Sequence, residues 1–216
     1  MRATLYIIYR VSEDRKAHWQ QIYATRKCTE VSWFQPVPER SLGLIRATGT
    51  PPGSAILDVG GGASTLVDHL LEDGFDDVSV LDIAAAAFDQ PRSRLGAKAE
   101  KVTWIESDIT AFEPPHSYAI WHDRAVFHFL TETSDQDRYL DVLHKALLPG
   151  GHLILATFGP KGPLRCSGLE IQRYSVERLQ DVLGPGFQLR HHEIDEHQTP
   201  TGSGQQFLYA WFDLAN

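Results

Sequence analysis

The sequence predicts an α/β protein with a doubly wound, mostly parallel seven-stranded sheet and helices on both faces. Three observations lead to this prediction. Short apolar runs alternate with helical segments from residue 55 onward. Residues 56–66 pass from an apolar run through three consecutive glycines into an amphipathic helix. The chain closes with two strand-like segments that have only turn residues between them, which predicts an antiparallel hairpin.

The individual elements follow from apolar periodicity and from glycine and proline stops. Parallel strands are expected at residues 55–59, 78–82, 102–106, 118–122 and 152–158. Helices are expected at residues 64–72, 84–95, 135–147 and 176–183, with Ser175 as the N-cap of the last. The closing hairpin is expected to pair residues 187–194 with 206–213.

Length and composition restrict the class of protein. A chain of 216 residues with 42% hydrophobic residues is expected to form one globular domain with a full core. A net charge of −8 and the lack of any Lys or Arg run disfavour nucleic acid as the main partner. The apolar runs are too short to span a membrane, and the two cysteines match no metal-site spacing. We expect a cytoplasmic monomer or weak dimer without a metal.

Asp58 indicates which ligand the glycine turn at Gly60, Gly61 and Gly62 takes. Glycines allow a ligand to lie against bare backbone. A carboxylate that closes the strand just before this turn would repel a pyrophosphate, but it suits a cationic amino-acid head group. S-adenosylmethionine carries an ammonium and a sulfonium and therefore fits this charge pattern better than a dinucleotide does.

Four short motifs together resemble those of class I S-adenosylmethionine-dependent methyltransferases. They lie at residues 57–62, 80–83, 106–109 and 147–153, and the resemblance covers about residues 53–213. One departure is Ser64, which stands at the place of the family's third glycine. The resemblance implies a sheet of strand order 3-2-1-4-5-7-6. It also implies S-adenosyl-L-methionine as cofactor and S-adenosyl-L-homocysteine as product.

The motifs suggest a cofactor contact for each acidic residue, beside a plainer structural interpretation. Asp58 is expected near the methionyl ammonium, or else as a turn or helix-terminus residue. Asp82, followed by Ile83, is expected to accept the ribose hydroxyls, and a helix N-cap role is compatible with this. Asp108 is expected to bind the adenine amino group, with Ile109 beside the ring. A plain loop aspartate is the alternative for Asp108.

The segment after the fourth strand partly resembles the Trp-Asp-Arg-Gly motif of thiopurine-type methyltransferases. Ala125 replaces the glycine, and His122 is inserted before Asp123. By resemblance Asp123 lies near the transferred methyl and contacts the cofactor, whereas an ion pair with Arg124 or a neighbouring basic residue is the alternative. His122 is a candidate general base, because imidazole titrates near neutral pH. His128 is a candidate substrate contact, although a core histidine is the more common case.

Residues 1–50 are expected to form a lid or cap, and residues 51–216 the methyltransferase domain. The lid is expected to contain a short amphipathic helix at residues 18–23 and an aromatic loop at 31–36. Aromatic faces can stack on adenine or enclose a sulfonium, and a closed lid excludes water. By similarity to relatives, Trp33 is assigned to the cofactor and Phe34 to the substrate. Plain packing is the alternative for the aromatic residues of the helix.

Two later segments contain further candidates. The loop at residues 159–169 holds Arg165, which is expected to bind an anionic substrate, and Cys166, a thiol contact with the substrate or else a buried thiol. Residues 191–197 are rich in His, Asp and Glu, but on a strand the side chains alternate between faces. No two histidines then share a face at ligand spacing except through the turn at His197, so we expect no metal.

These observations favour methyl transfer to a nitrogen, oxygen or sulfur nucleophile on a small molecule. A protein-lysine methyltransferase is an alternative, because some relatives of similar size have that activity and an acidic chain suits a basic segment. A non-catalytic module that binds S-adenosylmethionine is an alternative from another class. An NAD-linked oxidoreductase is disfavoured by Asp58 and by the closing hairpin.

Overall fold

A seven-stranded sheet forms the centre of the protein. The computed structural model describes residues 2–215, with side chains from Asp14 onward. The strand order is β3-β2-β1-β4-β5-β9-β8, with β1 to β5 parallel and β9 and β8 antiparallel. The predicted order is confirmed, because β8 and β9 are the sixth and seventh strands of this sheet. The strands are β1 Ile56–Val59, β2 Val78–Asp82, β3 Val102–Glu106, β4 Tyr118–Arg124, β5 Leu147–Phe158, β8 Phe187–Gln198 and β9 Gly204–Leu214.

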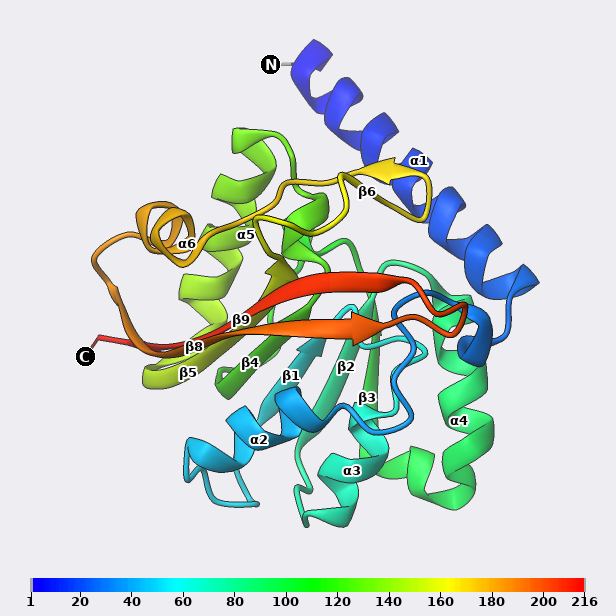
Figure 1. Ribbon diagram of the computed structural model, residues 1–216, viewed down its shortest axis with the longest axis vertical. Coiled ribbons are helices and arrows are strands. Elements are labelled where there is room, and N and C mark those ends of the chain that lie inside the picture. Colours follow the sequence, from blue (N-terminus) through cyan, green and yellow to red (C-terminus); the bar gives the residue numbers. More distant parts are fainter. Residues whose placement is uncertain (1, 216) are drawn as a thin grey trace.

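Helices cover both faces of the sheet, and a long N-terminal helix crosses one end of it (Figure 1). The α-helices are α1 Arg2–Thr25, α2 Glu39–Ala47, α3 Leu66–Glu72, α4 Asp89–Leu95, α5 Thr133–Ala146 and α6 Val176–Leu183. The 3-10 helices are η1 Cys28–Glu30, η2 Ala85–Phe88, η3 Gly96–Lys101, η4 Ile109–Ala111 and η5 Phe127–Phe129. Helices α2 and α3 lie on one face, and α5 and α6 lie on the other.

Several predicted boundaries were wrong. The helix expected at residues 84–95 is divided into η2 and α4, because Pro91 has no N–H to bond to the previous turn. The helix expected at 18–23 is the end of the much longer α1. Strand β5 begins at Leu147, so the expected helix stop at residues 149–151 lies inside β5. The pairing with β4 is irregular there, because β5 advances from Leu147 to His152 while β4 advances only from Tyr118 to Ile120. The loop at residues 159–169 contains a small hairpin of β6 Arg165–Cys166 and β7 Leu169–Glu170.

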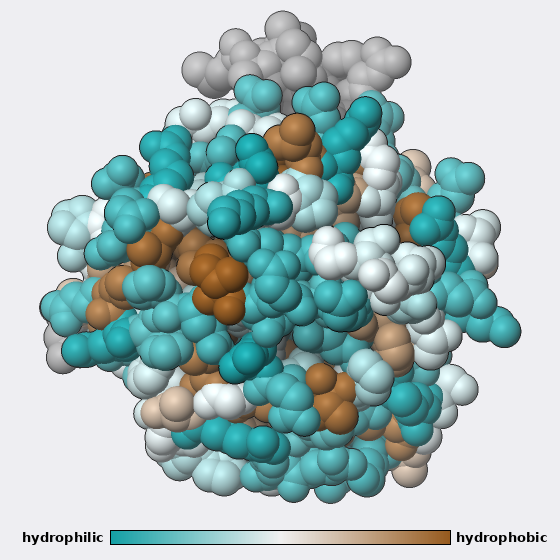
Figure 2. Space-filling model, in the orientation of Figure 1, coloured by the Kyte–Doolittle hydropathy of each residue, from teal (hydrophilic) through white to brown (hydrophobic). Residues whose placement is uncertain are grey.

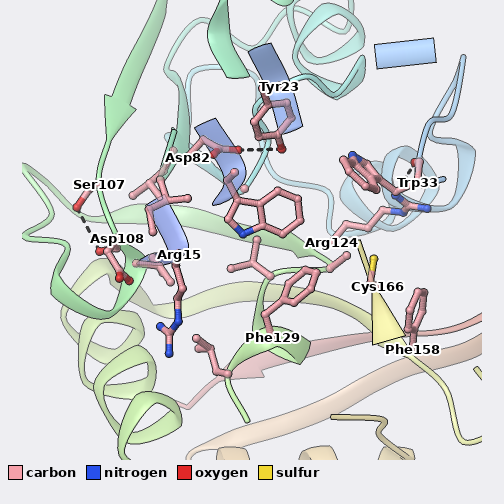
Figure 3. A pocket seen from close by; sticks show the side chains of 18 of the residues that line it. Arg15, Tyr23, Trp33, Asp82, Ser107, Asp108, Arg124, Phe129, Phe158 and Cys166 are labelled. Atoms are coloured by element: carbon pink, nitrogen blue, oxygen red, sulfur yellow. Dashed lines mark hydrogen bonds between the residues drawn. The ribbon is translucent and has the colours of Figure 1, made fainter. Parts of the chain in front are cut away.

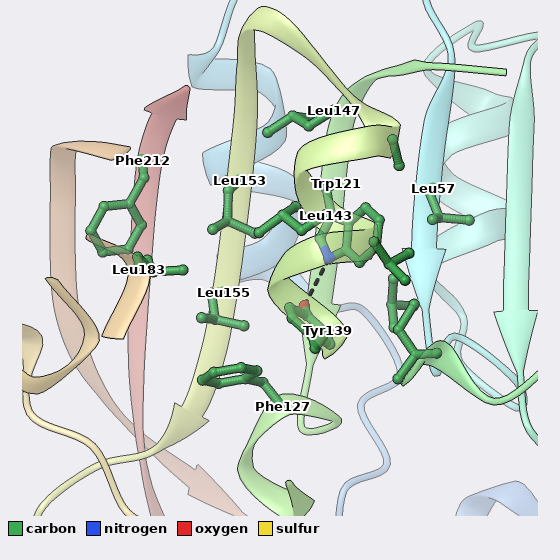
Figure 4. Packing of buried hydrophobic residues seen from close by; sticks show 14 of the residues in the cluster. Leu57, Trp121, Phe127, Tyr139, Leu143, Leu147, Leu153, Leu155, Leu183 and Phe212 are labelled. Carbon is green, nitrogen blue, oxygen red and sulfur yellow. Dashed lines mark hydrogen bonds between the residues drawn. The ribbon is translucent and has the colours of Figure 1, made fainter. Parts of the chain in front are cut away.

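Strand alternation divides the core into two clusters. Leu57, Trp121 and Leu153 pack against α5 and α6, as Figure 4 shows. Ile56 and Ile120 point to the opposite face, toward α2 and α3. Consecutive side chains at the carboxyl ends of the strands therefore also lie on opposite faces of the sheet. This alternation determines which polar residues meet there.

Helix α2 belongs to the core, although it falls within the predicted cap at residues 1–50. Its Leu42 and Ile45 are buried in the cluster that also contains Ile56. The remainder of that range, α1 and the loop after it, lies over the carboxyl ends of the strands. Met1 and Asn216 lie outside the described residues.

The face of the molecule in Figure 2 is mostly hydrophilic, with small hydrophobic patches between polar residues. Large hydrophobic side chains exposed on the described surface are Val37, Leu148, Leu164 and Ile194. Among the described residues, no helix has the length and apolar character needed to cross a lipid bilayer.

Candidate functional site

Two adjoining cavities lie at the carboxyl ends of the parallel strands, where open α/β sheets bind ligands. The larger one extends from the ends of β2 and β3, past Gly60, to β5, β6 and β9 (Figure 3). Trp19 and Tyr23 of α1 form part of its wall. The smaller cavity lies between the glycine turn and the loop after η1, and Trp33 and Arg124 line both cavities.

The glycine turn leaves no room for side chains. Gly60 has a φ of +66°, and a Cβ there would overlap the Val126 side chain. A Cβ on Gly61 would overlap Oδ2 of Asp58, and one on Gly62 would overlap Oδ2 of Asp82. The absence of side chains therefore lets two carboxylates approach the turn closely. Ser64, at the family's third glycine position, accepts a hydrogen bond from the Leu66 N–H at 3.0 Å.

Asp58 and His122 form a buried pair beside this turn. Both residues are 2% exposed, and His122 Nδ1 lies 2.7 Å from Asp58 Oδ1. His122 Nε2 lies 2.8 Å from the Ser41 hydroxyl on α2. Because a carboxylate only accepts, Nδ1 carries the proton donated to Asp58, and Nε2 shares a hydrogen bond with the Ser41 hydroxyl. Both ring nitrogens of the candidate base are thus engaged, whereas Oδ2 of Asp58 is buried without a hydrogen-bond partner.

Asp82 closes β2 and faces the larger cavity. Its Oδ1 accepts the Ala84 N–H at 3.0 Å. This is a turn contact and not the predicted helix N-cap, because the N-cap position of η2 is Ala84. The Tyr23 hydroxyl donates to Oδ2 over 3.4 Å, and Ile83 lines the cavity next to it. Burial raises the pKa of the Asp82 carboxyl to about 7.

Asp108 follows β3 and also lines the larger cavity, together with Ser107 and Ile109. Its Oδ1 accepts hydrogen bonds from the backbone N–H and the hydroxyl of Thr110 at 2.9 and 2.8 Å. These bonds orient Asp108 at the start of η4. The structure therefore brings Asp58, Asp82 and Asp108 to one edge of the sheet.

Asp123 lies on the opposite face of β4 from His122. Its side chain is fully buried and accepts hydrogen bonds from the Val126 N–H at 2.9 Å and the Tyr139 hydroxyl at 2.7 Å. The Phe127 N–H donates at 3.1 Å. Burial raises the pKa of this carboxyl to about 6. Asp123 lines neither cavity, and its contacts hold the turn after β4 against α5. The alternative interpretation, an ion pair between Asp123 and Arg124, is not observed, because Arg124 bonds to Tyr209 and Trp33 instead.

His128 is also removed from the cavities. It is fully buried, and its Nδ1 accepts the Phe158 N–H at 3.3 Å. Burial, followed by the charge of Arg124, lowers the pKa of His128 to about 3, so the ring is neutral. The His128 ring packs between Phe129 and Phe158, as expected for a histidine of the hydrophobic core.

Arg124 joins the aromatic loop to β9. Its Nη1 donates to the Trp33 carbonyl at 3.0 Å and its Nε to the Tyr209 hydroxyl at 2.8 Å. Trp33 packs edge-on against Trp19, and Phe34 lines the smaller cavity. The aromatic loop is therefore held over both cavities.

Cys166 and Arg165, neighbours on β6, have different environments. Cys166 is buried and lines the larger cavity, and burial raises the pKa of its thiol to about 11. The exposed Arg165 donates to the Gly168 carbonyl of its own hairpin and lines neither cavity. The alternation of side chains along a strand separates them.

The acidic and histidine-rich strand β8 has other contacts. Glu193 and Asp195 pair with Arg40, and His197 donates from Nε2 to the Ser32 carbonyl at 2.8 Å. Among the described residues, no group of three or more His, Cys, Asp or Glu side chains is placed to hold a metal ion.

Sequence reasoning missed two residues of the site. Ser41 lies outside every motif, and only the packing of α2 brings it to His122. Arg124 was considered only as a partner of Asp123. Its position in the sequence could have indicated its role. Arg124 follows His122 by two residues, so the two side chains lie on the same face of β4.

Comparisons with known proteins agree with this geometry. Residues 57–153 match a family model described as a methyltransferase domain. No curated protein matches the sequence. The fold is similar to that of N-methyltransferase NodS from Bradyrhizobium japonicum WM9, solved with S-adenosyl-L-homocysteine. The identity is 17%, with a TM-score of 0.67 and coverage of 91% of this chain and 98% of that chain.

Two further solved structures have similar folds. The 1,6-didemethyltoxoflavin-N1-methyltransferase of Burkholderia thailandensis, with bound 1,6-didemethyltoxoflavin and S-adenosylhomocysteine, is 14% identical, with a TM-score of 0.70 and coverage of 100% of this chain and 90% of that chain. A structure from work on conversion of a disulfide bond into a thioacetal group during echinomycin biosynthesis is 17% identical. Its TM-score is 0.70, with coverage of 93% of this chain and 91% of that chain. At these identities the likeness shows the fold.

Proposed function

We propose that this chain, a class I S-adenosylmethionine-dependent methyltransferase by its family match and its fold, transfers a methyl group to a nitrogen, oxygen or sulfur nucleophile of a small molecule. The main support is the free oxygen of Asp58. This buried acceptor has no partner among the described residues, and it lies against a glycine turn without side chains. A buried unpaired acceptor is costly, and a cationic ligand group would satisfy it.

The residues at this edge fit each part of S-adenosylmethionine. Asp58 Oδ2 would accept from the methionyl ammonium, beside the bare backbone of Gly60 and Gly61. Asp82 would accept the ribose hydroxyls with Oδ2, which Tyr23 contacts at 3.4 Å. Asp108 would accept from the adenine amino group, with Ile109 against the ring. When bound, S-adenosylmethionine supplies a methyl group on an already activated sulfonium.

The N-terminal segment would act as a lid over this site. Trp19 and Tyr23 of α1 and Trp33 of the following loop line the larger cavity. Ion pairs hold α1 in place, between Arg15 and Asp135 and between Lys16 and Glu106. Closure of such a segment would exclude water from a reactive methyl donor. Because α2 belongs to the core, we assign the lid to residues before 38.

The chain's own contribution to the reaction would be orientation rather than proton transfer. Among the described residues that line the larger cavity, none is a histidine, and its carboxylates, Asp82 and Asp108, lie at the proposed cofactor end. Near the other end, burial raises the pKa of the Cys166 thiol to about 11, so this thiol stays protonated. The acceptor nucleophile would therefore arrive unprotonated, and positioning would supply most of the rate.

Arg124 argues against the protein-lysine alternative. Its guanidinium lies at the end of the cavity away from Asp82, where it would repel a lysine ammonium. A turnover assay distinguishes an enzyme from the alternative, a non-catalytic module that binds S-adenosylmethionine. The cytoplasmic location and the monomeric or weakly dimeric state stay predictions, which cell fractionation and size-exclusion chromatography would test.

Calorimetric titration with S-adenosylhomocysteine tests the proposal, with NAD as the control ligand. We expect binding in the micromolar range, and we expect Asp82→Ala to weaken it by about 1–3 kcal/mol through loss of a hydrogen bond to a charged group. Asp181→Ala is a matched control, because it is the same change at an exposed position of α6. Absence of heat and of any thermal shift with the folded wild type would refute the proposal.

A further inference from the structure

Arg124 carries unused hydrogen-bonding capacity at the end of the larger cavity. A guanidinium has five N–H donors in a planar fork. One bond from Nε goes to Tyr209 and one from Nη1 to the Trp33 carbonyl. Nη2 is buried and has no hydrogen-bond partner. Both Nη2 donors and the second Nη1 donor therefore remain for a ligand.

The positive charge of Arg124 is also uncompensated. No carboxylate of the described residues forms an ion pair with it, although the chain as a whole is acidic. Its guanidinium lies over the Phe207 ring, 4.5 Å from the ring centroid, and Phe158 also lines this part of the cavity. A cation among aromatic rings is costly to bury without an anion.

The direction of the side chain separates this group from Asp82 and Asp108, although Arg124 also lines the smaller cavity together with Asp58. Arg124 pairs with Ala156 of β5, which in turn pairs with Tyr209 of β9. The guanidinium reaches across β5 to the Tyr209 hydroxyl and so points away from β1 and β2. Figure 3 shows Arg124 near Trp33 and Cys166, with Asp82 and Asp108 on the other side of the cavity.

We propose that Arg124 binds a carboxylate of the methyl acceptor, and that the acceptor is a small anionic molecule with a flat apolar body. This inference rests on the proposed function. The paired Nη donors match the two oxygens of a carboxylate, and the aromatic side chains of Trp33, Phe158 and Phe207 match the apolar body. The anion-binding role expected for Arg165 therefore passes to Arg124.

Benzoate and its neutral counterpart benzamide test the inference in calorimetric titrations of protein saturated with S-adenosylhomocysteine. We expect wild type to bind benzoate roughly tenfold to a hundredfold more tightly than benzamide, the range for hydrogen bonds to a charged group. Arg124→Gln is expected to remove this preference, and titration of the same variant with S-adenosylhomocysteine checks that its cofactor site still forms. Arg165→Gln, the same change at an exposed arginine, keeps the preference.

Equal binding of benzoate and benzamide by wild type would overturn the inference, and this comparison needs no variant. Benzoate binding unaffected by Arg124→Gln would also overturn it. A large loss of affinity for S-adenosylhomocysteine in Arg124→Gln would assign Arg124 to the cofactor's own carboxylate instead. Failure of wild type to bind S-adenosylhomocysteine refutes the proposed function separately, and the benzoate comparison is then made without it.

Discussion

His122 Nδ1 lies 2.7 Å from Asp58 Oδ1, and this buried hydrogen bond directs the other Asp58 oxygen toward the glycine turn. Ser41 holds the opposite ring nitrogen at 2.8 Å, so the imidazole connects α2 to the proposed ammonium acceptor. In this arrangement His122 is a positioning residue. It acts on the ligand through Asp58.

Replacement of His122 is therefore expected to affect ligand binding. In His122→Ala, Asp58 loses its partner, and we expect the affinity for S-adenosylhomocysteine to fall by roughly 1–3 kcal/mol. Ser41→Ala is the milder comparison, because the imidazole keeps its bond to Asp58. Calorimetry and steady-state kinetics measure the two effects. A general base would instead lower kcat, with the affinity for S-adenosylhomocysteine intact.

Asp82 is expected to make ligand-free stability fall as pH rises. Burial raises its folded pKa from 3.8 to about 7, so the folded chain holds the proton more tightly than the unfolded chain. The free energy of unfolding then decreases between these two values as pH increases. Urea denaturation measures the free energy of unfolding of wild type and of Asp82→Asn between these two pH values. The variant should gain stability relative to wild type as pH rises. If the stability difference between the two proteins did not change with pH, the raised pKa of Asp82 would be wrong.

His128 is expected to act in the opposite direction. Its folded pKa of about 3 lies below the ordinary 6.5, so the unfolded chain takes up the proton first on acidification. Stability attributable to His128 is therefore lost as pH falls below 6.5, by up to about 1.4 kcal/mol per pH unit. His128→Asn should show a flatter acid limb in urea denaturation. His191→Asn, at an exposed position of β8, should keep the wild-type slope.

Ala125 has a φ of +73°, a conformation that costs an L-residue roughly 1–2 kcal/mol. Glycine relieves this strain but loses about 0.5–1 kcal/mol through its greater freedom in the unfolded chain. Ala125→Gly is thus expected to stabilise the protein by up to about 1.5 kcal/mol. The same change at Ala119 in β4 should destabilise it. Thermal unfolding compares the two, and equal effects would show that Ala125 stores no strain.

The fold and the cofactor edge were accessible from the sequence because their signals are local. Alternating strands and helices predicted a mostly parallel sheet, and the resemblance to class I methyltransferases implied its strand order. The glycines at 60–62 predicted the turn. The end of the larger cavity at Arg124, where we propose that the methyl acceptor binds, could not be predicted from local sequence signals. Its residues come from α1, β4, β6 and β9, and no single segment contains enough of them to form a motif.

By itself, the sequence determined the class of fold, the glycine turn and the places of Asp58, next to last in β1, and Asp82, last in β2. Each of these depends on neighbours a few residues away. Only the tertiary structure decided the roles of residues 122 to 124. One residue of shift along a strand exchanges the faces, so Asp123 turns toward Tyr139, whereas His122 and Arg124 turn toward the cavities. The choice between Arg165 and Arg124 was decided in the same way, because burial and direction depend on strands that are distant in the chain.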